Sequence, residues 1–340
     1  MLLLPEATGP HDPATATPPR TPGSVRRTSS IDTTRPDGLR AASVVEARAR
    51  DLLTARDGQA RVLGEAALHA RVARSGELEE ARARPAAPVD GLLGARVGAG
   101  FRGRLAEVLP GERARCTLLH LLLDDLPGAT LVSGYALQRA GMLSGLGVRP
   151  GMVREDVCAG WAHEASLMTA VREHAEIPVP LGPSAPDLAG PGDPLAWHPM
   201  DDLPPHGMRR RRRLDLVAPA DGGDGGWLVD AHFRDSYVDP EGRESVLHEY
   251  TVAGEVRPAA GVVVAMAARA RVLPWTECPG AVASAGRLVG MALGDLRARV
   301  RQELVGRSTC THLNDTLRAM ADLPALAGAL SAGLAPAAGG

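Results

Sequence analysis

Hydrophobic and polar residues alternate along three stretches in the second half of the chain, at 226–233, 245–256 and 261–272. In the first stretch, apolar side chains share one face, and Asp230 and His232 fall on the other face. In the second, His248 shares its face with valines and a tyrosine. A period of two residues is typical of strands, because successive side chains point to opposite faces of a sheet. The short links between the stretches predict an antiparallel meander.

Helices are expected after the third strand. Pro279 favours the first turn of a helix, so the sequence predicts that Cys278 caps the helix that follows it. A second helix is expected over 294–305, and a third, with an apolar stripe, begins near 309–311. Cys278 and Cys310 would then both lie at helix N-termini, where free N–H groups and the helix dipole stabilise a thiolate. A thiolate can bind a metal ion or attack a substrate.

The chain also contains an internal duplication. Residues 44–65 superpose without a gap on residues 228–249, and the likeness resumes with small insertions between 92–127 and 288–324. We therefore predict an α+β protein of two tandem pseudo-repeats, each an antiparallel three-stranded meander with helices packed on one face. The expected boundaries are a disordered tail at 1–24, a first repeat at 25–139, a Gly/Pro-rich connector at 140–207, a second repeat at 208–326 and a disordered tail at 327–340.

The two repeats differ where reactive side chains would lie. His248 of the second repeat corresponds to Gly64 of the first. Leu118 stands in the first repeat where His312 stands in the second, and nothing in the first corresponds to Cys278. The second repeat is therefore expected to carry the chemistry, with the first as a degenerate structural partner.

Composition narrows the possible functions. The chain of 340 residues has a net charge of −2 and only 3% aromatic residues, so it has no strong attraction for nucleic acid. It contains no lysine, which excludes a pyridoxal phosphate Schiff base and a P-loop lysine. The four cysteines are too scattered for a disulfide framework, and no signal peptide or membrane-spanning stretch is recognised. We therefore expect a cytoplasmic protein that acts on a small molecule; the oligomeric state stays open.

Several motifs resemble a known bacterial family. "VDAHFRDS", "VLHEY", "PWTECP" and "CTHLNDTLRAM" are similar to domain-of-unknown-function family 2889, in its actinobacterial two-copy form. This resemblance covers nearly the whole chain and implies no particular activity.

A second resemblance covers about 246–320 and concerns the U-type iron–sulfur cluster scaffold proteins. His248, Cys278 and Cys310 match the ligand positions of that family in order, and His312 follows the last of them. The resemblance implies a metal site formed by these four residues. Because a histidine replaces the first cysteine and the last pair is not adjacent, a mononuclear Zn or Fe site is the alternative to an iron–sulfur cluster. Two cysteines and two histidines form a known closed zinc set.

The leading hypothesis is a metal-dependent hydrolase or lyase that acts on a small organic molecule. The ion would polarise a carbonyl or activate water, while Asp230 or His232 moves a proton. Cys158 of the connector could reach the site as a nucleophile or a further ligand. One alternative is a non-catalytic iron–sulfur or metal scaffold. The other is a metal-free enzyme in which Cys310 is a nucleophile beside His312.

Two further motifs have the composition of ligand sites. The arginine run at 209–213 could bind a phosphate or carboxylate, but the sequence favours a solvated segment that opens the second repeat. "GAGFRG" at 98–103 has the spacing of a dinucleotide fingerprint. The stretch before it is broken by Gly94 and Arg96 and makes a poor buried strand, so the sequence does not favour an NAD site.

Overall fold

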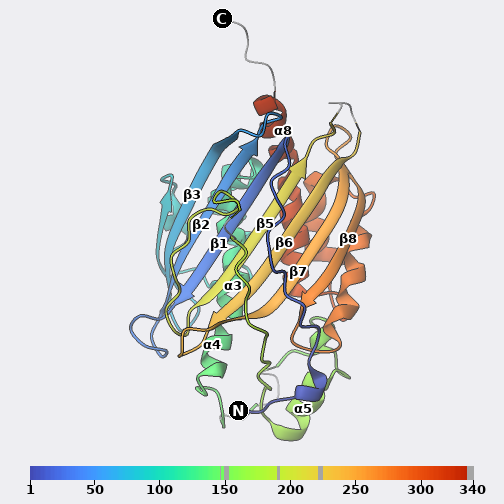
Figure 1. Ribbon diagram of the computed structural model, residues 1–340. Helices are drawn as coiled ribbons and strands as arrows, with labels where there is room; N and C mark the ends of the chain where they lie inside the picture. The colour runs from blue at the N-terminus through green and yellow to red at the C-terminus, as the bar shows by residue number, and fades with distance from the viewer. Residues whose placement is uncertain (146, 149–152, 190–191, 221–224, 335–340) are drawn as a thin grey trace, which may run out of the picture.

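A computed structural model of the chain describes residues 1–145, 147–148, 153–189, 192–220 and 225–334. Its centre is an eight-stranded antiparallel sheet with the order β4-β3-β2-β1-β5-β6-β7-β8 (Figure 1). The strands are β1 (Ser24–Thr34), β2 (Ser43–Thr54), β3 (Ala60–Val72), β4 (Leu78–Arg84), β5 (Met208–Val217), β6 (Trp227–Val238), β7 (Glu244–Arg257) and β8 (Val262–Val272).

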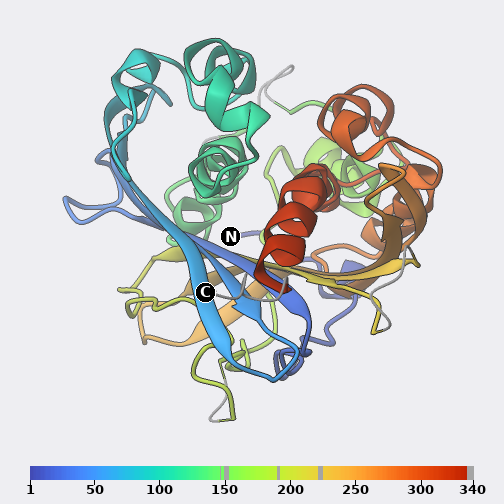
Figure 2. The ribbon, with the colours of Figure 1, turned by 90° about the horizontal axis from the view of Figure 1, so that it is seen from above.

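The α-helices of both halves cover one face of this sheet, and the N-terminal segment and the later part of the connector cross the other face (Figure 2). The α-helices are α1 (Phe101–Val108), α2 (Pro110–Ala114), α3 (Leu118–Val132), α4 (Gly134–Arg139), α5 (Ser166–His174), α6 (Leu296–Glu303), α7 (Thr311–Ala319) and α8 (Leu323–Leu334). Short 3-10 segments are η1 (Pro5–Ala7), η2 (Val89–Leu92), η3 (Ala159–Trp161), η4 (Cys278–Leu288), η5 (Leu293–Asp295) and η6 (Met320–Asp322). No helix in the described ranges is both long and apolar enough to cross a membrane.

The α+β class agrees with the expectation, but the strand count of each half was wrong. Strands β1 to β4 and β5 to β8 each form a four-stranded meander, and antiparallel pairing of β1 with β5 joins them into one sheet. The missed strands are the first of each half. Both carry arginine and other polar residues where a hydrophobic alternation would have indicated a strand.

The arginine run lies inside β5, so the expected solvated segment is also wrong. All five arginines are buried. Alternate side chains point to opposite faces of the sheet, and carboxylates on strands and on α3 pair with them. Arg209 binds Asp32 of β1, with 2.6 Å between Nε and Oδ1, and Arg210 binds Asp235 of β6, with 2.8 Å between the same atom types. A central strand of a sheet can therefore be highly charged when its charges are paired.

Parts of the two segments expected to be disordered tails contact the rest of the chain. Thr8 and His11 form isolated bridges with Trp275 and Val272 beside β8, and the Ala14 N–H donates to the Glu249 carboxylate over 2.9 Å. These contacts order the N-terminal segment along the sheet. At the other end, α8 includes residues 327–334 and buries leucines against the sheet, whereas 335–340 lie outside the described residues.

Two apolar clusters lie between the sheet and its helices, one in each half. The first combines side chains of β2 to β4 with α1 and α3, and the second combines β6 to β8 with η4, α6, α7 and α8. Between the clusters, near the junction of β1 and β5, the layer contains buried arginine and aspartate side chains. The polar junction is where the candidate site begins.

Candidate functional site

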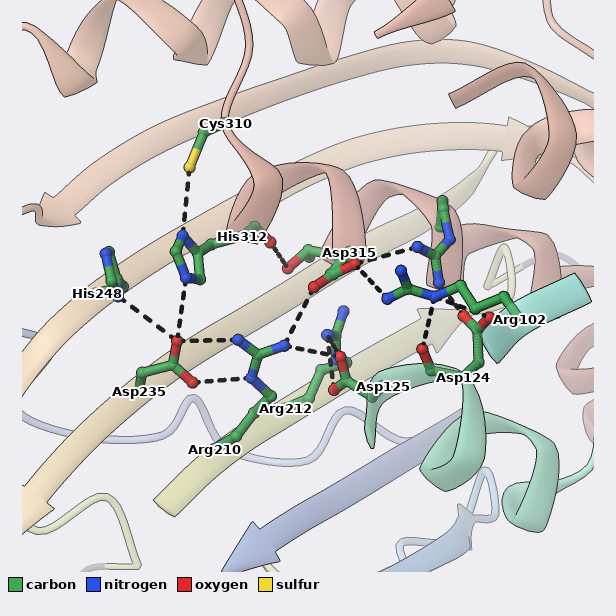
Figure 3. A network of polar contacts seen from close by, with 12 residues as sticks. Arg102, Asp124, Asp125, Arg210, Arg212, Asp235, His248, Cys310, His312 and Asp315 are labelled. Carbon is green, nitrogen blue, oxygen red and sulfur yellow. Dashed lines mark hydrogen bonds and ion pairs between the residues drawn. The ribbon is translucent and has the colours of Figure 1, made fainter. Parts of the chain in front are cut away.

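Three side chains converge beneath the helices of the second half. Asp235 comes from β6, His248 from β7 and His312 from the first turn of α7 (Figure 3). The Asp235 Oδ2 atom lies 3.5 Å from His248 Nδ1 and 3.7 Å from His312 Nε2. The two imidazole rings stack, with centroids 3.7 Å apart and planes inclined by 20°.

Strand pairing explains why Asp235 and His248 meet. The two residues are direct cross-strand partners in the antiparallel β6–β7 ladder, so their side chains leave the same face side by side. The register shifts immediately after this pair, which leaves Leu247 as the extra residue of a β-bulge. A bulge bends its strand and redirects side chains, and here it places both Leu247 and His248 at one cavity.

Cys310 lies on the other side of the His312 ring. Its Sγ atom is 3.7 Å from His312 Nδ1, so the imidazole stands between the thiol and the Asp235 carboxylate (Figure 3). Cys310 is the N-cap residue of α7, so it lies at a helix N-terminus as the sequence predicted. The thiol lies at the start of α7, with the Tyr250 hydroxyl beside it. A thiol, an imidazole and a carboxylate are therefore arranged in series.

Asp235 is held from behind by a buried ion network. Arg210 donates to both of its oxygens, over 2.8 Å from Nε and 3.1 Å from Nη2. The same guanidinium reaches Asp125 of α3 at 2.9 Å and Asp315 of α7 at 3.1 Å. Burial alone would raise the pKa of Asp235, but Arg210 and the His248 ring outweigh it and hold this pKa well below its usual value. The carboxylate is therefore ionised, and its place is fixed.

Burial sets the protonation of the other two groups in the series. It raises the pKa of the Cys310 thiol, although the Tyr250 hydroxyl and the backbone N–H groups oppose this effect in part. It also lowers the pKa of His312 well below 6.5, and the neighbouring His248 adds to that shift. At neutral pH the pair is thus a neutral thiol beside a neutral imidazole.

The series ends at a cavity of about 400 Å³. Cys310, His312 and His248 line it, whereas Asp235 is fully buried behind them. Its walls come from the end of α3, from α4, from the connector and from the second half. Two further candidates, Cys158 and Cys278, line the same cavity. Burial raises the pKa of Cys158 to about 12 and that of Cys278 well above 9, the same direction as for Cys310.

The expected ligand set of His248, Cys278, Cys310 and His312 thus shares one cavity but is not one cluster of ligand atoms. Within the described ranges, the group whose ligand atoms all lie within 4.8 Å of one another is Asp235, His248 and His312. Cys278 also differs in local structure from the expectation. It is the first residue of the 3-10 segment η4, and Glu277 takes the cap position.

Asp230 and His232, expected to move protons, lie on the opposite face of β6 from Asp235. His232 Nε2 is 2.8 Å from the Glu249 carboxylate, and its ring packs edge-on against Trp197. Asp230 is half-exposed and pairs with Arg213. The sheet therefore separates both residues from the cavity.

The sequence reasoning missed Asp235. The signal was present, because Asp235 follows Phe233 by two residues and so falls on the apolar face of its strand. A carboxylate on an apolar face needs a buried partner, and the arginine run supplies it. The run could not be recognised as a strand, so the pairing was not apparent.

Fold and site together define an α+β protein in which a thiol, an imidazole and a carboxylate are aligned at the inner end of a cavity. Residues 208–325 are similar to a family model described as "Protein of unknown function (DUF2889)". The matched segment contains β5 to β8 and every member of the thiol–imidazole–carboxylate series. Comparison with curated proteins gave no match, and comparison with solved structures gave none.

Proposed function

We propose that this protein is a cysteine-dependent enzyme that transfers or hydrolyses the acyl group of a small, largely apolar molecule. The supporting observation is the order Cys310, His312, Asp235, with the first two residues at the cavity and the third buried behind them. A nucleophile, a base and a group that orients the base are the three roles that acyl transfer requires. An apolar cavity supplies the water-poor surroundings in which such groups act.

The chemistry starts from the neutral pair. Sγ of Cys310 attacks the carbonyl carbon while His312 Nδ1 takes the thiol proton, so a carbon–sulfur bond forms as the carbonyl π bond opens. The Asp235 carboxylate, facing Nε2 at 3.7 Å, stabilises the imidazolium. His312 then returns the proton to the leaving group, and the acyl group stays on sulfur. Water, deprotonated by the same imidazole, releases the acid and regenerates the thiol.

The start of α7 supplies the remaining element of this reaction. The negative charge that develops on the carbonyl oxygen needs fixed donors, which are most often backbone N–H groups. The first N–H groups of a helix have no partner within the helix, and those of His312 and Leu313 belong to the first turn of α7, directly after Cys310. They are the donors that we assign to the oxyanion.

A p-nitrophenyl butyrate assay tests the proposal. The expected result is a burst of p-nitrophenolate, at most one per chain, with a butyryl group found on Cys310 by peptide mass spectrometry. Cys310→Ala should abolish the burst, and His312→Gln should slow it by at least about a hundredfold, the usual contribution of a general base. Cys278→Ala is the matched control, because Cys278 lines the same cavity but is not next to an imidazole. Acylation of Cys278 alone, or an unchanged burst in His312→Gln, would contradict the proposal.

A second candidate, the metal-dependent enzyme, is favoured by the spacing of Asp235, His248 and His312. In a tetrahedral zinc site with bonds of about 2.0–2.1 Å, two ligand atoms are about 3.3–3.4 Å apart. Separations of 3.5 and 3.7 Å from Asp235 Oδ2 are close to this value. His248 Nδ1 is buried, and the described part of the chain offers it no hydrogen-bond partner. Zn or Fe held there could polarise a carbonyl or activate water.

We place the metal second because of the geometry around the same atoms. Lone pairs of nearly parallel rings do not converge on one point, so the rings would have to turn to bind an ion. Arg210 also donates to the same Asp235 oxygen that would be a ligand. Elemental analysis of the purified protein and its activity after 1,10-phenanthroline treatment separate the candidates. Loss of activity with loss of one ion per chain supports the metal, and iron with inorganic sulfide would support a cluster scaffold.

We further propose that the two halves derive from one duplicated unit, in the two-copy form that the sequence resembles. The gap-free superposition of 44–65 on 228–249 supports this, because the same shift of 184 residues carries the bounds of β2 onto those of β6. Each half also has a bulge at the corresponding position, after Asp51 and after Asp235. A separately expressed 208–334 fragment that forms a homodimer would support this origin, and a fragment that stays unfolded would argue against it.

A further inference from the structure

The cavity in front of Cys310 changes character from its inner end to its outer end. At the inner end, Cys310 is 6% exposed and Leu273 is fully buried. At the outer end, Leu131 is 73% exposed and Val157 is 36% exposed. A ligand that reaches the thiol must therefore lie along an apolar passage and end among apolar side chains at the surface.

Charge is found at the outer end of the passage. Among the described residues that line the cavity there is no aspartate or glutamate, and Arg154 is the one arginine. Arg154 is exposed. The acidic residues next to it in the chain are engaged elsewhere, since Glu155 binds His163 at 2.7 Å and Asp156 accepts from the His163 backbone N–H at 2.9 Å. The mouth of the cavity thus has a cationic group, and its inner part is uncharged.

From this polarity we infer that the cavity binds an amphipathic acid, an elongated apolar molecule whose carboxylate stays at Arg154 while its other end reaches Cys310. At about 30 Å³ for each water-sized group, a cavity of about 400 Å³ holds roughly thirteen non-hydrogen atoms. That is the size of a carboxylate with a chain of about ten carbons or an aryl body. The inference rests on the proposed function in one respect only: a substrate would also carry an electrophilic carbonyl at the end of the molecule that reaches Cys310.

Binding of decanoate to the full-length protein tests the inference without any reaction. Trp161 and Trp275 line the cavity, so their fluorescence should report binding, and isothermal titration calorimetry gives the dissociation constant. Decanol is the matched neutral ligand. Each methylene added from hexanoate to decanoate should tighten binding by up to about fourfold, the value for a fully buried methylene. Arg154→Gln should weaken decanoate about fivefold and leave decanol unchanged.

Two variants act as controls. Arg104→Gln removes an exposed arginine of α1 that lies outside the cavity lining, and it should leave both dissociation constants unchanged. Cys310→Ala should still bind decanoate, so a failure of the acyl-enzyme proposal is distinguishable from a failure of this one. Absence of saturable binding by either ligand would overturn the inference. Equal affinity for decanoate and decanol, unaltered in Arg154→Gln, would overturn its anionic part.

Discussion

Replacing Asp125 by asparagine tests how far the buried charges stabilise this fold. Asp125 of α3 is 4% exposed and accepts hydrogen bonds from two arginines of β5, Arg210 at 2.9 Å and Arg212 at 2.8 Å. Arg210 keeps Asp235 and Asp315 as partners when Asp125 is neutralised. Arg212 is 3% exposed, and the described residues offer it no other carboxylate. The substitution therefore leaves one guanidinium buried without a counter-charge.

Breaking a buried pair in this way costs about 3–5 kcal/mol, because the remaining charge stays desolvated. At about 2.1 cal/mol/K of unfolding entropy per residue, a chain of 340 residues that unfolds in one step has about 0.7 kcal/mol/K. Thermal unfolding followed by calorimetry should then show Tm about 4–7 °C lower than in the wild type. Asp57→Asn, at an exposed turn, is the control and should lower Tm by less than about 1 °C.

Replacing the orphaned arginine as well should recover much of the loss, since apolar residues of similar volume often replace buried ion pairs without destabilisation. We expect Asp125→Asn/Arg212→Met to unfold at a higher temperature than Asp125→Asn alone. A Tm for Asp125→Asn that equals that of the exposed control would refute the reasoning, because the arginine would then be solvated in the folded state. A double variant less stable than the single one would refute it as well.

Three further predictions concern pH, backbone packing and the thiol. Burial lowers the pKa of His120 to about 4, whereas a histidine of the unfolded chain has a pKa of about 6.5, so the unfolded chain binds more protons between these two pH values. The free energy of unfolding, measured with urea, should therefore fall by about 2 kcal/mol from pH 7 to pH 5 because of this residue. The variant His120→Leu should lack this part of the decrease. Gly182→Ala should lower unfolding free energy by about 2–3 kcal/mol, because a Cβ would lie 1.6 Å from the Val246 carbonyl oxygen, whereas Gly280→Ala meets nothing within 4 Å and should be nearly neutral in the same assay. Because burial raises the pKa of Cys310, its alkylation by iodoacetamide, followed by mass spectrometry, should still increase above pH 9; a plateau near pH 7 would show that the thiolate forms more readily.

Much of the second half could be predicted from alternation and turn residues. The three expected strands overlap β6, β7 and β8, and Cys310 lies at the N-terminus of α7 as expected. The strands β1 and β5 could not be predicted in the same way, because their buried residues are charged or polar. An arginine run is usually solvated, and only its partners on β1, β6 and α3 make burial possible. Those partners are remote in sequence, so the hydrophobic and polar pattern around the arginine run does not indicate them.

The candidate site was partly within reach of the sequence. His248, Cys310 and His312 were recognised, and the structure brings all three to one cavity. Asp230 and His232 were chosen because they share a strand face, yet that face is turned away from the helices. Alternation shows which residues lie together but not which face is covered by helices. Asp235 was on the other face and became visible only when β5 placed Arg210 next to it.

The two halves contain similar buried ion triads but differ in the side chains around them. Each half has an arginine that binds an aspartate of the next strand and an aspartate from the opposite half: Arg27 with Asp51 and Asp322, and Arg210 with Asp235 and Asp125. These triads join the halves and need no catalytic role. In the first half, the strand partner of Asp51 is Gly64, and a Cβ at Gly64 would meet Leu118 at 3.8 Å.

In the second half the corresponding strand partner is His248, and the side chain of His312 from α7 reaches the same aspartate. Asp235 therefore interacts with Arg210 and with two imidazoles. One of these, that of His312, lies next to a thiol at the cavity. The Arg210–Asp235 ion pair can stabilise the fold without contact to the cavity, so the link through the His312 ring is not explained by stability. Because the halves share the triad and differ in the histidines, the histidines are the feature that a function has to explain, whichever of the two proposed chemistries they serve.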